Sequence, residues 1–159
     1  EQGVRDRITR LMSVRGQQPA SVFHKRLGKI MWDHCGMSRN EESLKKAISL
    51  IRELREEFWN DLLVPGSAGE LNQDLEKAGR VADFLELAEL LVTDALERRE
   101  SCGAHFREEF RASEGEALRN DKEYACVAAW EYKGNNIPHA LHREELVFTD
   151  TVTGERNYK

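Results

Sequence analysis

The sequence predicts a mainly α-helical domain, an antiparallel three-helix bundle of the spectrin-repeat type that ends in a short C-terminal β-hairpin and tail. Three observations support this fold class. Apolar residues recur every three or four positions in long segments, clusters of proline and glycine separate these segments, and after Gly103 the pattern changes to alternation. A chain of 159 residues with 40% hydrophobic content is long enough to form one domain with its own core.

Charge and composition exclude several classes of function. The chain carries 24 Lys and Arg against 29 Asp and Glu, which gives a net charge of -5. Because no overall positive field is present, we predict no nucleic-acid partner. Uninterrupted apolar runs are far shorter than the roughly 20 residues that a membrane-spanning helix needs, so we predict no direct membrane insertion. Cys35, Cys102 and Cys126 fit neither a disulfide framework nor a zinc motif, and we expect free thiols.

The first two helices are predicted from apolar periodicity and from the residues that interrupt it. Apolar residues at helical spacing before Gly16 predict a short connector helix within residues 1–16. Pro19 favours the start of a second helix, because proline in the first turn loses no needed hydrogen bond. Gly36 is expected to end this helix in a left-handed cap.

The third helix is predicted to start at a capping box formed by Ser38 and Glu41, in which each side chain bonds a free backbone N–H. It should end before Pro65, where residues 65–69 have the composition of a surface loop.

The fourth helix is expected to be the longest and to lie at the centre of the bundle. Asn72 is predicted to be its N-cap, and its apolar positions continue to about Arg99. These positions cover more than one face of the helix, so it should contact more than one neighbour. The bundle is therefore predicted to span residues 17–110.

Residues 111–159 are predicted to form a hairpin and a tail. Apolar residues alternate from Tyr124 to Tyr132 as on one face of a strand, and Gly134, with the two asparagines after it, indicates a turn. Leu146 and Phe148 offer a short second strand.

No constellation of residues in this chain predicts chemistry of its own, so neither a catalytic, nor a cofactor-binding, nor a metal site is expected. Asp33, His34 and Cys35 are adjacent and would point about 100° apart on a helix. Cys102 and His105 could share a helical face, but Gly103 is expected to break the helix between them. The five histidines show no metal-ligand spacing. Neighbouring carboxylates at residues 108 and 109 indicate a charged surface or docking segment.

Two segments resemble a known family. Residues 98–109, RRESCGAHFREE, are similar to the R-x-E-S-R-G-A-H-x-R-E-D signature of succinate dehydrogenase and fumarate reductase flavoproteins. Residues 30–39, IMWDHCGMSR, are similar to the I-M-W-x-x-x-G-x-x-R stretch of the same family, and residues 156–158 give a weaker match to its R-x-Y end. The chain departs from the signature at Cys102, where arginine is usual, and at Glu109, where aspartate is usual.

The resemblance implies the C-terminal domain of a flavoprotein subunit. Such a subunit holds FAD upstream, interconverts succinate and fumarate, and passes electrons to an iron–sulfur subunit. The partners implied are the flavin-binding and capping domains of the same chain and the iron–sulfur subunit, at a cytoplasmic, peripheral location on the inner face of the cell membrane. This fragment alone should hold no cofactor and be inactive. The alternatives are the C-terminal domain of L-aspartate oxidase and, from another class, a free-standing helical interaction module.

The matched motifs suggest Arg39, Arg99, His105 and Arg107 as contacts between this bundle and the flavin and capping domains. The alternative for each residue is a role inside the bundle, because arginine and histidine near helix C-termini also cap helices and hold turns.

Overall fold

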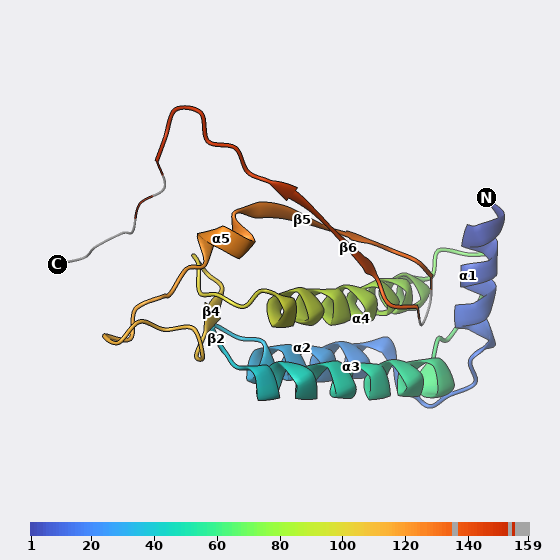
Figure 1. The fold of residues 1–159 in the computed structure, drawn as a ribbon. Coiled ribbons are helices and arrows are strands. Elements are labelled where there is room, and N and C mark those ends of the chain that lie inside the picture. The colour runs from blue at the N-terminus through green and yellow to red at the C-terminus, as the bar shows by residue number, and fades with distance from the viewer. Residues whose placement is uncertain (135–136, 153, 155–159) are drawn as a thin grey trace. The chain divides into compact units, whose positions relative to one another are not determined.

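The computed structural model describes residues 1–134, 137–152 and 154, and it confirms a mainly α-helical chain with a short C-terminal hairpin (Figure 1). Four helices of substantial length occur in the order α1 (Gln2–Ser13), α2 (Ala20–His34), α3 (Glu41–Asp61) and α4 (Gln73–Glu97). Contacts divide the chain into two compact units, Glu1–Leu118 and Arg119–Lys159.

Helices α2, α3 and α4 form the three-helix bundle and share one apolar core. Their inward residues recur at helical spacing, which is why the sequence pattern located all three helices. At the centre, the rings of Phe23 and Phe58 pack edge to face with centroids 5.3 Å apart. Leu44, Ile51 and Leu85 are also fully buried.

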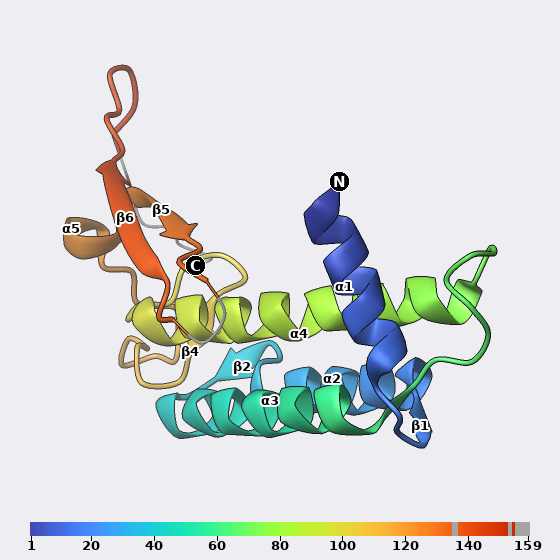
Figure 2. The ribbon, with the colours of Figure 1, turned by 90° about the vertical axis from the view of Figure 1, so that its right-hand side faces the viewer.

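Helix α1 crosses α4 and completes one side of the bundle (Figure 2). Leu11 is buried in the common core, and Arg7 Nη2 donates to Gly79 O at 2.7 Å and to Asp83 Oδ1 at 2.6 Å. The predicted connector helix is therefore a helix that packs on the bundle through its apolar side.

The helix caps correct two details of the sequence prediction. The N-cap of α3 is Asn40, whose side chain accepts from Ser43 N at 2.8 Å, so the capping box predicted at Ser38 is wrong. Ser38 instead lies in an extended segment. Helix α2 ends at His34, its C-cap residue Cys35 has φ -132°, and Gly36 is not left-handed. Asn72 is confirmed as the N-cap of α4, where it accepts two backbone N–H bonds.

At each end of the bundle, two chain segments are joined by a short parallel pair of strands. Strand β1 (Gln18–Pro19) pairs with β3 (Leu62–Leu63), and β2 (Ser38–Arg39) pairs with β4 (Phe106–Arg107). Two-residue strands leave no periodic signal, so the sequence could not predict them. The second pair positions the segment that resembles the family signature.

The second unit contains the short helix α5 (Asp121–Tyr124) and an antiparallel hairpin of β5 (Cys126–Glu131) and β6 (Ala140–Glu145). The first strand is where alternation predicted it. The second strand lies earlier than Leu146 and Phe148, because its exposed polar residues hide the strand pattern. The asparagines of the predicted turn and the Arg156–Tyr158 match lie outside the described residues.

Candidate functional site

The two segments that resemble the family motifs meet at one end of the bundle. The parallel pairing of β2 with β4 aligns Ser38 with Phe106 and Arg39 with Arg107. Glu108 N then donates to Arg39 O at 2.8 Å. The turn after α2 and the loop after α4 are thus bound to each other, and we call residues 98–109 the motif loop.

Arg107 is the centre of the motif loop and is 1% exposed. Its Nη1 donates to Ala95 O at 2.9 Å and to Leu96 O at 3.2 Å, and its Nε donates to Glu109 Oε2 at 3.1 Å. The last carbonyls of a helix have no partner within the helix, so Arg107 caps the C-terminus of α4. All of these partners belong to the bundle itself.

A buried serine fixes the backbone of the same loop. Arg107 N donates to Ser101 Oγ at 2.8 Å, and that hydroxyl donates to Arg107 O at 3.1 Å. Beside it, Glu100 is 2% exposed and pairs with Arg98 at 2.7 Å. Among the described residues, every buried side-chain nitrogen or oxygen has a partner. Ser101 and Glu100 were not proposed from the sequence, although both stand in the matched signature.

Two neighbouring carboxylates bind the start of α3. Glu108 accepts from Ser38 Oγ at 2.7 Å and from Asn40 Nδ2 at 3.2 Å, while Glu109 accepts from the backbone N–H of Glu41. Burial raises the pKa of Glu109, but the bonds from Glu41 and Arg107 outweigh it and leave the pKa below its ordinary value. These carboxylates therefore hold a helix N-terminus, where negative charge is favoured.

His105 connects the motif loop to Arg39. Its Nε2 lies 2.9 Å from Arg98 O, a pure acceptor, so Nε2 carries the proton and Nδ1 accepts from Arg39 Nη1 at 3.0 Å. The ring is half-buried and neutral in this arrangement. Arg39 Nε also donates to Gly36 O at 2.8 Å, which fixes the turn after α2.

The position of Cys102 excludes a thiol–imidazole pair with His105 on one helical face. Cys102 and His105 exchange backbone hydrogen bonds of 2.8 and 3.0 Å across a tight turn, and Gly103 adopts φ +59° within it. The two residues share no helical face. The family signature has an arginine at position 102, where this chain has a cysteine. In this loop, the ion pair to Glu100 comes from Arg98.

The adjacent Asp33, His34 and Cys35 do not form a reactive group. Asp33 pairs with Lys29 at 2.8 Å, and His34 Nδ1 lies 2.9 Å from Ser43 Oγ. Burial raises the pKa of the Cys35 thiol, which disfavours the reactive thiolate. Within the described ranges, no three His, Cys, Asp or Glu side chains converge as a metal site would require.

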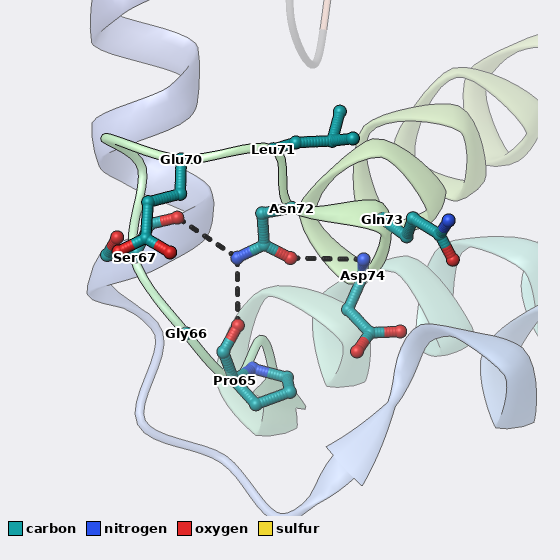
Figure 3. Close-up of a pocket in the computed structure, with 8 residues that line it drawn as sticks. All are labelled: Pro65, Gly66, Ser67, Glu70, Leu71, Asn72, Gln73 and Asp74. Carbon is teal, nitrogen blue, oxygen red and sulfur yellow. Dashed lines mark hydrogen bonds between the residues drawn. The ribbon is translucent and has the colours of Figure 1, made fainter.

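A hollow of about 400 Å³ lies in the loop before α4 (Figure 3). Asn72 is one of the lining residues, and its Nδ2 donates to Pro65 O at 2.8 Å and to Ser67 O at 3.1 Å while its Oδ1 caps the helix. Glu70 and Asp74 line the hollow, so its charge opposes the diphosphate of FAD. The hollow therefore does not fit that cofactor.

Acidification should weaken the motif loop through His105. Burial is the largest effect on the pKa of His105 and lowers it; the hydrogen bond to the Arg98 carbonyl opposes this, and the nearby arginine charges add to the lowering. In the unfolded chain the histidine takes up a proton near its ordinary pKa of about 6.5. The stability that neutral His105 contributes to the folded domain is therefore complete above that pH, and it is lost as the pH falls through the lower pKa of the folded state. We expect the urea midpoint to fall between about pH 7.5 and about pH 5, and His105→Gln to flatten that decline. Equal pH slopes in both proteins would contradict this role.

Comparisons with known proteins agree with the geometry. A family described as "Fumarate reductase flavoprotein C-term" matches residues 24–158. The fumarate reductase flavoprotein subunit of Haemophilus influenzae is 27% identical over 152 residues, which cover 96% of this chain and 24% of that protein. An uncharacterized FAD-dependent oxidoreductase of Methanocaldococcus jannaschii is 33% identical over 110 residues, which cover 69% of this chain and 19% of that protein.

The fold is also shared with solved structures. The structure of E. coli quinol fumarate reductase superimposes with a TM-score of 0.81 at 24% identity, over 97% of this chain and 25% of that one. The chain thus spans about a quarter or less of the length of the proteins it matches.

The helical bundle with the motif loop at one end, together with the family match, identifies this chain as the C-terminal domain of a flavoprotein oxidoreductase subunit. More specifically, the chain belongs to the C-terminal domain family of the fumarate reductase and succinate dehydrogenase flavoproteins. No helix in the described part of the chain is both long and apolar enough to cross a membrane.

Proposed function

We propose that this chain is the structural C-terminal domain of a flavoprotein subunit that interconverts succinate and fumarate through FAD and passes electrons to an iron–sulfur subunit. The family match over residues 24–158 carries the proposal. In the proposed assembly, FAD and the reacting dicarboxylate are held upstream in the same polypeptide. The assembly lies on the cytoplasmic face of the membrane through partner subunits.

The isolated domain is proposed to be inactive. The polar groups of its motif loop already bind its own helix ends, as Arg107 does at α4 and Glu109 does at α3. A group that acts on a substrate must be able to reach it, and Arg107 is 1% exposed. The domain's role is therefore to stabilise the parent subunit.

The four residues proposed as interdomain contacts differ in how available they are. Arg107 is buried, and Arg39 and His105 are half-buried and bonded to each other. Arg99 is exposed beside them. Arg99 is thus the member of this set best placed to reach a neighbouring domain, while the other three would act by shaping the loop that presents it.

The full polypeptide that contains this chain tests the proposed function. After purification, we expect stoichiometric bound FAD by absorbance, fumarate reduction with a reduced dye, and succinate oxidation in the reverse direction. L-Aspartate should not be oxidised, because the fumarate reductase match extends over 96% of the chain. Turnover of L-aspartate instead would assign the alternative enzyme. A polypeptide without flavin would contradict both assignments.

A further inference from the structure

Four large apolar side chains lie exposed on two neighbouring helices of the bundle. They are Trp32 on α2, 83% exposed, and Phe84, Leu87 and Leu91 on α4, which are 40%, 58% and 44% exposed. The three leucine and phenylalanine positions are spaced by three and four residues, so they share one side of α4 over about 10 Å. We call this surface the α2–α4 face.

The two helices meet within the α2–α4 face at His24 and Phe84. The ring of His24 on α2 lies 5.6 Å from the ring of Phe84 on α4. His24, Gly28 and Trp32 follow at four-residue spacing, which places them along the same part of α2. A Cβ added to Gly28 would meet nothing within 4 Å, so the backbone of α2 is open to a partner there.

The opposite side of the bundle is different. Helix α3 has 21 residues, and none of the large hydrophobic residues found exposed in the described chain belongs to it. Its outward side carries charged and polar residues, among them Lys46, Ser49 and Glu53. Large contiguous apolar patches on a folded monomer mark binding sites, and tryptophan is enriched where binding energy concentrates. The asymmetry therefore marks the α2–α4 face as an interface.

We propose that the α2–α4 face is the surface on which the flavin-binding part of the same polypeptide packs, an inference that rests on the proposed function above. This chain spans only 24% of the related Haemophilus influenzae flavoprotein, so the partner has ample length in the same molecule. A covalently attached partner is present at a high effective concentration, and a second copy of the chain is not.

The position of the face within the motifs supports the same partner. Trp32 lies in the IMW segment, and α4 leads directly from Leu91 into the motif loop. Figure 1 shows α2 and α4 side by side, and the two helices contact each other. Residues of the α2–α4 face thus lie within, or shortly before, the two segments that resemble the family motifs.

Hydroxyl-radical footprinting of the intact full-length subunit tests the proposal without any substitution. Relative to the unfolded subunit, Trp32, Leu87 and Leu91 should be protected about tenfold, because the core of an interface excludes water. Leu71, which is 97% exposed and lies in the loop before α4, is the control and should show little protection. Labelling of Trp32 and Leu87 as fast as Leu71, in a subunit that binds FAD and reduces fumarate, would overturn this inference and leave the proposed function standing.

A charge introduced into the face provides a second test. Leu87→Glu should reduce the FAD retained through gel filtration about tenfold, because a carboxylate would be buried without a partner. Lys46→Glu on the outward side of α3 is the matched control and should retain FAD as the unaltered subunit does. Equal retention by both variants, or protection of the face that appears only with concentration-dependent dimerisation, would overturn the proposed partner. A subunit that binds no FAD at all would remove the proposed function and this inference with it.

Discussion

Replacement of Arg107 by alanine is expected to lower the free energy of unfolding of the domain by about 3–5 kcal/mol. The guanidinium is 1% exposed and binds Ala95 O, Leu96 O and Glu109. Its carbon also lies 5.4 Å above the ring of Phe110. Removal would leave the buried carbonyl of Ala95 and the part-buried carbonyl of Leu96 without this donor, and it would free the carboxylate that holds α3. Urea unfolding followed by circular dichroism measures the loss.

Arg99→Ala is the matched control for Arg107. Arg99 stands in the same motif and carries the same charge, but it is exposed. Its replacement should change the free energy of unfolding by less than about 0.5 kcal/mol. If Arg107→Ala unfolded like the unaltered domain and affected only assembly of the full subunit, Arg107 would be an interdomain contact and not a helix cap.

Gly16→Ala is expected to cost about 3 kcal/mol or more, because the new methyl group has no space. An added Cβ would lie 1.9 to 2.2 Å from the backbone atoms of Asp61, and Gly16 N donates to Leu62 O at 3.1 Å. Backbone atoms cannot move aside as a side chain can. The substitution should therefore separate the segment before α2 from the end of α3, which thermal unfolding would detect.

Gly28→Ala provides the control for a glycine on an open helix surface. Nothing lies within 4 Å of its added Cβ, and alanine favours the helix, so the isolated domain should gain about 0.5–1 kcal/mol. Equal melting temperatures for Gly16→Ala and Gly28→Ala would show that the close approach to Asp61 is absent in solution.

The helices could be predicted from the sequence because each one buries a periodic apolar stripe. The residues that contact the core, such as Leu44, Ile51 and Leu85, are the ones that defined the pattern. Helix ends were harder to predict. Ser38 and Glu41 have the spacing of a capping box, but Ser38 is needed in the β2–β4 pair and Asn40 takes the cap. A long-range pairing overrode a local signal.

The candidate site was predicted only in part, because its partners are distant in the sequence or lie in the backbone. The matched signature identified Arg107 and His105, but it could not show that Arg107 bonds carbonyls of α4 or that His105 accepts from Arg39, 66 positions earlier. Ser101 binds backbone atoms alone, which leaves no recognisable side-chain pattern. The interdomain role of Arg39, Arg99, His105 and Arg107 remains a prediction.

The central claim is that this domain stabilises a flavoprotein whose chemistry lies elsewhere in the polypeptide. Its most direct test is the rate of fumarate reduction per bound FAD in the full polypeptide carrying His105→Gln or Arg99→Ala. The claim predicts an unchanged rate per bound FAD, even if less FAD is retained. A decrease of about a hundredfold or more at full FAD occupancy, as expected for a lost acid or base, would place a catalytic group in this domain and contradict it.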